Sequence, residues 1–279
     1  MNQTAFNQLV VALTPRYGEG EARSIARIVI EDAFHTKSYA TWMLPDEERD
    51  RFQQLLQSLV KGVPVQYVLG EADFFGLRFA VNPSVLIPRQ ETEELVDWAL
   101  SILRNQSAPK VLDIGLGSGC IGITLKVKKN DVELWGVEKS PEALEVARSN
   151  ARRLLGDSSV QLLEGDILTG VPALQRSWDL IISNPPYIPR EEASIMPEHV
   201  LEHEPDMALF VEGADPLLFY RKIIIFAGEW LLLGGALLLE CNEFNAKQVA
   251  ELLENAGFKE VELKKDLSGA DRMVMGKRT

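Results

Sequence analysis

The chain has 279 residues, 46% of them hydrophobic, which is enough for a sizeable core and a second small domain. Its net charge of −12 at pH 7 argues against a nucleic-acid-binding protein, because such proteins usually carry a basic face. The longest apolar stretch is broken by glycines and a glutamate, and the first residues lack the pattern of a secretory signal. We therefore expect a cytoplasmic protein that does not enter a membrane and keeps its two cysteines reduced.

Residues 1 to about 62 are predicted to be helical. Apolar residues recur there at helical spacing in three stretches, which begin near Phe6, Ile25 and Phe52. Residues that break helices punctuate these stretches and predict several separate helices; they are Pro15, Gly18, Gly20 and Pro45. Such a section is typical of a small helical domain.

Residues 73–81 are rich in aromatic side chains around a central glycine, which predicts a β-hairpin. A polar run at 89–94 follows and opens a helix, and the Thr92 hydroxyl is expected to cap the first turn of that helix. The hairpin is therefore the expected linker between the helical section and the rest of the chain.

From Lys110 onward, strand and helix patterns alternate, which predicts a doubly wound α/β fold with a mostly parallel sheet. Seven strands are expected, at 110–114, 132–137, 159–163, 178–183, 235–240, 259–264 and 272–276. The helices are expected near 119–129, 141–155, 215–231 and 244–256. Because the last two strands are too close for a helix between them, the final strand should insert antiparallel.

A glycine-rich turn, Gly115-Leu116-Gly117-Ser118-Gly119, follows the first of these strands and opens a helix. Glycines let the backbone approach a ligand, and the helix start offers free N–H groups, so we interpret the turn as a cofactor loop. The acidic Glu138, at the end of the next strand, can accept hydrogen bonds from both hydroxyls of a ribose.

Two nucleoside cofactors fit a loop of this kind. The Gly117, Gly119 and Gly122 spacing also fits a nicotinamide-binding loop. However, Asp113 would repel a pyrophosphate there, whereas it suits the cationic amino-acid end of S-adenosylmethionine. Asp166 and Ile167, after the third strand, are predicted to accept a hydrogen bond from the adenine amino group and to cover the adenine ring.

The most specific motif is Asn184-Pro185-Pro186-Tyr187, directly after the fourth strand. Two consecutive prolines remove two backbone donors, so the loop offers acceptors: the Asn184 side-chain oxygen and the Pro185 carbonyl. Two fixed acceptors suit an NH₂ group, and Tyr187 adds a face for a planar amide or base. The acceptors would orient a weakly nucleophilic nitrogen and stabilise the charge that it gains during methyl transfer. We expect Asn184, Pro185 and Tyr187 to be catalytic.

These motifs resemble, nearly from end to end, those of the bacterial release-factor glutamine methyltransferases. The matching segments are 62–70, 74–81, 85–93, 111–119, 183–188, Glu204-Pro205 and Asp271-Arg272. The resemblance implies a class I methyltransferase fold and S-adenosylmethionine as cofactor. Its substrate would be the glutamine of the Gly-Gly-Gln motif in a peptide chain release factor, bound at Asn184-Pro185-Pro186-Tyr187-Ile188. It also divides the chain into a helical substrate-recognition domain (1–72), a hairpin linker (73–88) and a catalytic domain (89–279).

The chain departs from the family pattern at three places. Leu116 stands where the family commonly has threonine, Gln90 replaces a proline, and residues 240–244 differ from the usual sequence after the fifth strand. The alternatives left open are glutamine methylation of a ribosomal protein, amino methylation of a nucleic-acid base, a catalytically silent binding module and a nicotinamide dehydrogenase. We expect a monomer without a metal site, since His199 and His203 share a helix face but lack a metal-binding motif.

Overall fold

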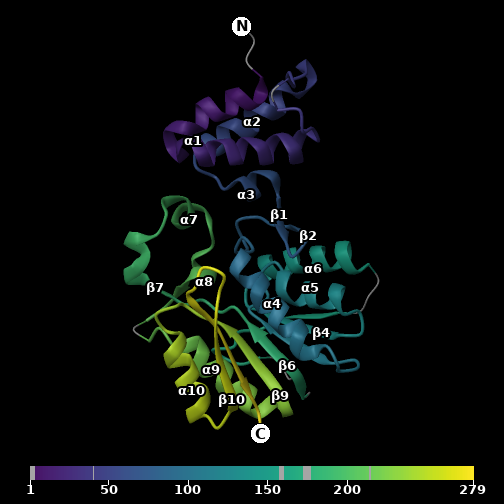
Figure 1. Cartoon of the computed structure of the whole chain (residues 1–279), viewed down its shortest axis with the longest axis vertical. Coiled ribbons are helices and arrows are strands. Elements are labelled where there is room, and N and C mark those ends of the chain that lie inside the picture. The colour runs from purple at the N-terminus through teal and green to yellow at the C-terminus, as the bar shows by residue number, and fades with distance from the viewer. Residues whose placement is uncertain (1–3, 40, 157–159, 172–176, 214) are drawn as a thin grey trace. The chain divides into compact units, whose positions relative to one another are not determined.

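The computed structural model describes residues 4–39, 41–156, 160–171, 177–213 and 215–279 (Figure 1). The contacts within the chain define two compact units. One comprises Met1–Glu71 together with Pro197–His203, and the other comprises Ala72–Met196 together with Glu204–Thr279. The short segment 197–203 therefore belongs with the N-terminal helices, although the sequence division assigned it to the catalytic domain.

The first unit is helical. Its elements are α1 (Ala5–Phe34), η1 (Asp46–Glu48), α2 (Arg49–Val60), α3 (Val65–Leu69) and α7 (Glu198–His203). Its core includes Leu9, Ile30 and Phe52, which are fully buried. Pro15 does not end a helix as predicted; α1 continues past it and departs from helical geometry only at Gly18, whose φ of 74° suits glycine.

The second unit begins with a two-stranded hairpin, β1 (Glu71–Phe74) and β2 (Leu77–Ala80), followed by α4 (Gln90–Leu103). Gln90 is the first residue of α4, where the family's proline would also be favourable because that position needs no N–H donor. The predicted cap was wrong: α4 begins before Thr92, which is buried in its first turn, and the Thr92 hydroxyl donates to Glu240 instead.

A seven-stranded sheet forms the centre of the second unit, with the order β10-β11-β9-β6-β3-β4-β5. Its strands are β3 (Lys110–Ile114), β4 (Glu133–Glu138), β5 (Gln161–Glu164), β6 (Trp178–Ser183), β9 (Leu231–Glu240), β10 (Lys259–Lys265) and β11 (Asp271–Lys277). The sheet confirms the predicted topology, because β11 inserts antiparallel between β9 and β10 while β9, β6, β3, β4 and β5 are parallel.

Helices cover both faces of this sheet (Figure 1). They are α5 (Cys120–Lys128) and α6 (Pro141–Leu155) beside α4, and α9 (Leu218–Trp230) and α10 (Ala246–Asn255) on the opposite face. Neighbouring strand residues point to opposite faces: Val111 packs into the core under α4, α5 and α6, and Leu112 packs into the core under α9 and α10.

Short elements complete the carboxyl edge of the sheet. They are β7 (Ile188–Pro189), η2 (Arg190–Ile195), α8 (Asp206–Leu209) and β8 (Phe210–Val211). β7 pairs in parallel with β8, with Ile188 opposite Phe210. This pairing holds α8 close to the loop that leaves β6.

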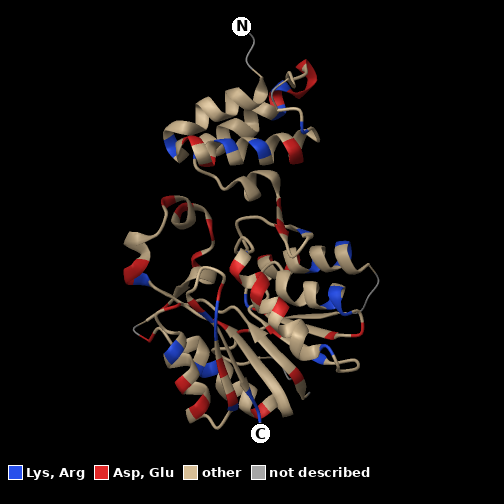
Figure 2. Ribbon diagram, viewed as in Figure 1, with Lys and Arg blue, Asp and Glu red and all other residues tan. Residues whose placement is uncertain are grey.

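Charged side chains of both signs are interspersed along the ribbon of both units (Figure 2). No described helix is long and apolar enough to cross a bilayer. In the described parts of the chain, no three histidine, cysteine or acidic side chains gather as metal ligands would.

Candidate active site

A cavity of about 320 Å³ lies at the carboxyl ends of β3, β4 and β6, where ligands bind in open parallel sheets. Its walls include the glycine loop, Glu138, Asp166, Ile167 and residues 184–186. The start of α4 and part of α8 complete the lining, and all of these residues belong to the second unit. The fold therefore brings the cofactor motifs and the Asn-Pro-Pro loop of the sequence to one cavity.

The glycine loop is shaped by its backbone. Gly115, Gly117 and Gly119 have φ angles of 76°, 55° and 81°, which side chains strongly disfavour. The N–H groups of Gly115 and Leu116 donate to the Val137 carbonyl at 2.9 and 3.2 Å, so the loop is anchored on the next strand. Gly119 also lacks room for a side chain, because a Cβ there would lie 2.6 Å from Ile123 Cδ1.

Ser118 places an unpaired hydroxyl beside the cavity. Its side chain is buried and lines the cavity, and its Oγ has no hydrogen-bond partner. Its backbone carbonyl accepts a hydrogen bond from the buried Asn150 Nδ2 at 2.9 Å, which fixes the turn from the α6 side. The hydroxyl oxygen is itself shielded from the cavity, so Ser118 contributes to the wall through its backbone turn.

Glu138 lies at the end of β4 and lines the cavity. Its Oε2 accepts from the Gly117 N–H at 2.8 Å, and its Oε1 accepts from the Ser140 N–H at 2.9 Å. A carboxylate oxygen has two lone-pair sites, so both oxygens keep acceptor capacity for ligand hydroxyls. Leu116 is buried against Gly136 and offers no hydroxyl where the family commonly has one.

Asp166 and Ile167 also line the cavity, after β5. The carboxylate of Asp166 is held from two sides: its Oδ2 pairs with Lys139 Nζ at 3.1 Å, and its Oδ1 accepts from the Leu168 N–H at 2.9 Å. Lys139 lines the same cavity, which the sequence interpretation did not foresee. Asp166 therefore enters the wall as an ion-paired and oriented acceptor.

The structure places Asp113 behind the cavity wall. This residue is fully buried and does not line the cavity. Its Oδ2 accepts from the Gly122 N–H at 2.9 Å and so ties β3 to α5, while its Oδ1 has no partner. Burial raises the pKa of Asp113 to about 7. The side chain points into the contact between strand and helix, because alternate residues of β3 face opposite sides of the sheet.

The loop after β6 separates into two parts. Asn184, Pro185 and Pro186 line the cavity, but Tyr187 and Ile188 do not. Tyr187 packs against the core under α9 and α10, and burial raises its pKa above the ordinary value. Ile188 enters β7. The direct substrate contacts expected for these two residues therefore find no counterpart in the cavity wall, because core packing and strand pairing turn them elsewhere.

Asn184 is oriented by a side-chain contact. Its Nδ2 donates to Thr92 Oγ1 at 3.3 Å, and Thr92 Oγ1 donates to Glu240 Oε2 at 2.7 Å. The amide nitrogen of Asn184 is thus engaged, and its oxygen is left as an acceptor. Burial raises the pKa of Glu240 to about 7, against the opposing effect of the Thr92 hydrogen bond.

An ion pair between the half-exposed Arg89 and the buried Glu204, which the sequence did not assign, also supports the cavity. Arg89 Nη2 contacts Glu204 Oε1 at 2.5 Å, and Glu204 Oε2 accepts from the Ile87 N–H at 3.2 Å. Glu204 is buried, and the following Pro205, Met207 and Ala208 line the cavity together with Arg89. Glu204-Pro205 was among the matching motifs. However, Arg89 lies 115 residues before Glu204, so no local sequence pattern indicates that the two side chains pair.

Known proteins are similar to this chain in sequence. Residues 95–214 match the family described as Methyltransferase small domain, and residues 4–70 match the PrmC N-terminal domain. A release factor glutamine methyltransferase of Flavobacterium psychrophilum is 42% identical, covering 96% of this chain and 95% of its own. One of Bacteroides thetaiotaomicron is 39% identical, covering 81% of this chain and 80% of its own.

A solved structure is similar in fold alone. The 16S rRNA N2 G1207 methyltransferase of T. thermophilus, in complex with AdoMet and guanosine, is 19% identical with a TM-score of 0.54. The match covers 75% of this chain and 50% of that protein. Identity above 30% over nearly the whole length is decisive where fold similarity is not, so the chain belongs to the family of release factor glutamine methyltransferases.

Proposed function

We propose that this protein transfers a methyl group from S-adenosylmethionine to the side-chain amide nitrogen of the glutamine in the Gly-Gly-Gln motif of a peptide chain release factor. The observation that carries the proposal is the orientation of Asn184 at the cavity, with its amide nitrogen engaged by Thr92 and its oxygen free to accept. The similarity to relatives named release factor glutamine methyltransferases supports the same substrate.

The cavity fits S-adenosylmethionine. Its polar groups suit a nucleoside joined to an amino acid: we propose that the backbone turn of residues 115–119 holds the amino-acid end, that Glu138 accepts from the ribose, and that Asp166 and Ile167 contact the adenine. When bound, S-adenosylmethionine supplies an electrophilic methyl group on its sulfonium sulfur. Asp113 contributes from behind the wall, by holding the start of α5 at Gly122.

The chemistry that the protein must supply is orientation and charge stabilisation. An amide nitrogen is a poor nucleophile because its lone pair is delocalised into the carbonyl. In our proposal, Asn184 Oδ1 and the Pro185 carbonyl accept the two hydrogens of the glutamine NH₂ and so direct its nitrogen toward the methyl group. They also stabilise the positive charge that the nitrogen gains, and the methylated nitrogen then loses a proton to water.

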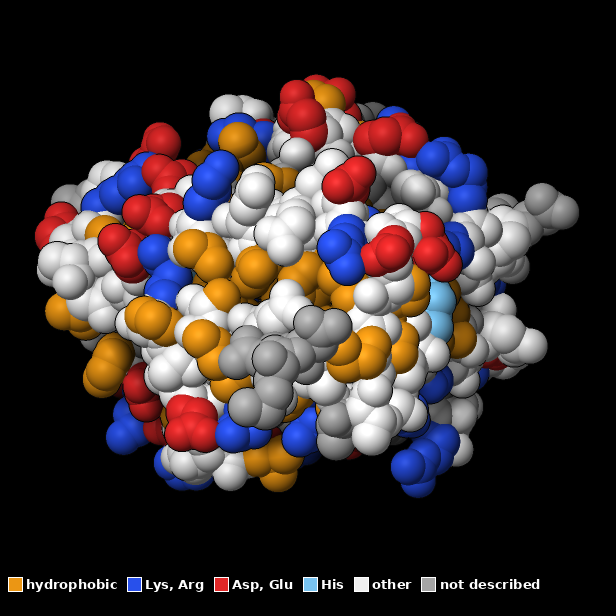
Figure 3. All heavy atoms as spheres, turned by 90° about the horizontal axis from the view of Figure 1, so that it is seen from above, with side chains coloured by type: hydrophobic (Ala, Val, Ile, Leu, Met, Phe, Trp, Pro, Cys, Tyr) orange, Lys and Arg blue, Asp and Glu red, His pale blue; other side chains and the backbone are white. Residues whose placement is uncertain are grey.

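The helical unit is proposed to recognise the release factor. It lines no part of the cavity and leaves apolar side chains exposed, among them Val11, Met43 and Val60. Hydrophobic groups are visible among charged ones on the face shown in Figure 3. We expect a chain shortened to begin at residue 73 to bind S-adenosylmethionine in calorimetry while losing methyl transfer to the folded substrate. Full activity of the shortened chain would refute this role.

One assay tests the proposed function. Labelled S-adenosylmethionine is offered with release factor, ribosomal proteins and DNA in parallel, and incorporated label is measured for each. We expect label in the release factor alone, and none when the Gly-Gly-Gln glutamine is changed to alanine. Label in a ribosomal protein or in DNA, with none in the release factor, would replace the proposed substrate by one of the alternatives.

A further inference from the structure

Three residues that are distant in sequence form one chain of hydrogen bonds beside the cavity. Asn184 follows β6, Thr92 lies in the first turn of α4, and Glu240 ends β9. Asn184 Nδ2 donates to Thr92 Oγ1 at 3.3 Å, and Thr92 Oγ1 donates to Glu240 Oε2 at 2.7 Å. Thr92 and Glu240 are buried, so water does not compete for these bonds. Glu240 does not line the cavity, and it acts on Asn184 through Thr92 and through its own contact with the Asn184 side chain, which lowers the pKa of Glu240 against the effect of burial.

When Glu240 is ionised, donors and acceptors along this chain of hydrogen bonds can be arranged in only one direction. An ionised carboxylate only accepts, so the one hydroxyl hydrogen of Thr92 is used on Glu240. Thr92 Oγ1 can then only accept from Asn184, which requires the NH₂ of the asparagine to face Thr92. The Asn184 oxygen must consequently face the other way, as an acceptor.

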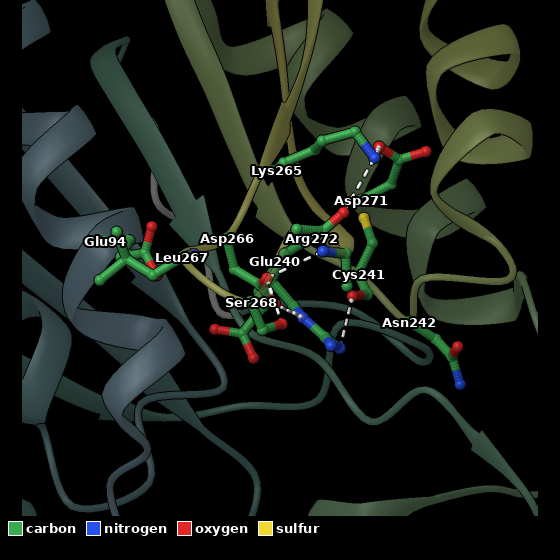
Figure 4. A network of polar contacts seen from close by, with 12 residues as sticks. Glu94, Glu240, Cys241, Asn242, Lys265, Asp266, Leu267, Ser268, Asp271 and Arg272 are labelled. Atoms are coloured by element: carbon green, nitrogen blue, oxygen red, sulfur yellow. Dashed lines mark hydrogen bonds and ion pairs between the residues drawn. The ribbon is translucent and has the colours of Figure 1, made fainter.

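The surroundings of Glu240 bear on its charge. Arg272 of β11 lowers the pKa of Glu240 and is itself held by Asp266 at 3.0 Å (Figure 4). Asp266 in turn accepts from Ser268 Oγ at 2.6 Å, and this contact lowers the pKa of Asp266 to about 2. Other ionisable groups that act on or near this carboxylate are Glu91 of α4, Tyr187 of the loop after β6, Cys120 and Cys241.

We propose that Thr92 and Glu240 are positioning residues, which hold the Asn184 side-chain amide with its oxygen, rather than its nitrogen, toward the substrate nitrogen. The inference rests on the proposed function. A glutamine NH₂ needs acceptors, and a flipped Asn184 would present a second NH₂ to it. Thr92 and Glu240 therefore exclude the unproductive orientation without touching the reacting atoms.

The test compares two substitutions of the same hydroxyl. Thr92→Val keeps the shape but removes the hydroxyl, and Thr92→Ser keeps the hydroxyl. We expect Thr92→Val to slow single-turnover methyl transfer to a release factor by about 10- to 100-fold, the scale of a misplaced catalytic group. Thr92→Ser should remain within about threefold of the wild type. Cofactor affinity, measured by calorimetry, should be unchanged in both.

A matched control separates loss of the hydrogen bond from disturbance of the core. Thr124 of α5 is fully buried, and its hydroxyl has no partner, so Thr124→Val makes the same chemical change without breaking a bond. This variant should transfer methyl groups at the wild-type rate, and the melting temperatures of all variants should confirm folding. If Thr92→Val is as fast as Thr124→Val, or Thr92→Ser as slow as Thr92→Val, the inference is wrong.

A second readout does not depend on the substrate. The Asn184 side-chain NH₂ can be assigned in ¹⁵N-labelled protein by its loss in Asn184→Ala. Its protons should exchange slowly with solvent in the wild type and in Thr92→Ser, and at least tenfold faster in Thr92→Val. Equal exchange in all three would overturn the proposed orientation. A wild-type enzyme that leaves release factor unlabelled but shows this exchange pattern would instead refute the proposed substrate.

The charge of Glu240 gives a further signature. If ionised Glu240 sets the direction of the hydrogen bonds from Asn184 through Thr92, the wild-type rate of methyl transfer should rise with pH as Glu240 ionises. Glu240→Gln should flatten this rise, because an amide does not titrate. A pH profile of Glu240→Gln that is identical to the wild type would exclude Glu240 from the positioning role and leave only Thr92.

Discussion

The two halves of the cavity are built in different ways. The half formed by residues 115–119 and Glu138 is shaped by backbone conformation and by bonds to the adjacent strand. The half formed by Asn184 and its neighbours is shaped by side chains from three separate elements. The first is therefore fixed by a local motif, whereas the second depends on the complete packing of α4, β6 and β9.

The largest effect is expected on the Asn184 side. Asn184→Ala removes one of two proposed acceptors, and loss of one preorganised contact typically costs about 2.7–4 kcal/mol, so turnover should fall roughly 100- to 1000-fold. Cofactor affinity should change little. Single-turnover transfer to a release factor measures this, with the glutamine-to-alanine substrate as control. Transfer at the wild-type rate would refute the mechanism, although the chain could still be a methyltransferase.

Asn184→Asp sharpens the same comparison. It keeps an acceptor and adds a negative charge near a nitrogen that becomes positive, so more activity should survive than in Asn184→Ala. If the two variants are equally slow, the amide group itself, rather than its acceptor oxygen, is what the reaction requires.

The next effect is expected on the cofactor side. Glu138→Ala removes the proposed ribose acceptor and a partner of the Gly117 and Ser140 N–H groups. Cofactor binding should weaken by about 1.5–3 kcal/mol, the scale of hydrogen bonds to a charged group. Calorimetry with S-adenosylmethionine measures the loss. Unchanged affinity would remove Glu138 from the cofactor site and leave the glycine loop as its main determinant.

A smaller effect is expected where α8 is fastened to the cavity. Arg89→Ala leaves the buried Glu204 without its cation, so the free energy of unfolding should fall by about 1–3 kcal/mol. Arg152→Ala is the matched control, because the Arg152–Glu145 pair is exposed and solvent screens it, so its loss should hardly change the free energy of unfolding. The free energies of unfolding of both variants are measured by urea unfolding at the same pH. Equal losses of this free energy would show that the Arg89–Glu204 pair does not hold α8 at the cavity.

The last prediction concerns how steeply the free energy of unfolding changes with pH. The folded-state pKa of Asp113 is about 7, raised from an ordinary value of 3.8, so folding favours its protonated form. Its stabilising contribution is complete below about pH 4 and is lost as pH rises through about 7. The stability of Asp113→Asn, measured by urea unfolding from pH 5 to 8, should therefore decline less with pH than that of the wild type. Parallel curves would mean that Asp113 is already ionised throughout.

The sequence by itself determined the succession of strands and helices along the chain, the antiparallel last strand and the two cavity loops. Hydrophobic periodicity, glycine at positive φ and consecutive prolines act over a few residues, so they are readable without the fold. Two local predictions failed: Pro15 lies inside α1, which is interrupted at Gly18 instead, and the Thr92 hydroxyl of the second unit donates to the distant Glu240 rather than capping α4.

Only the tertiary structure decided which side chains face the cavity. Asp113 turns behind the glycine loop, Tyr187 and Ile188 turn into core and strand contacts, and Lys139 enters the wall. The orientation of Asn184 likewise needs Thr92, which lies 92 residues before it in sequence, and Glu240, which lies 148 residues after Thr92. The direction of a side chain depends on partners that the chain brings together only when it is packed, and no local pattern encodes that.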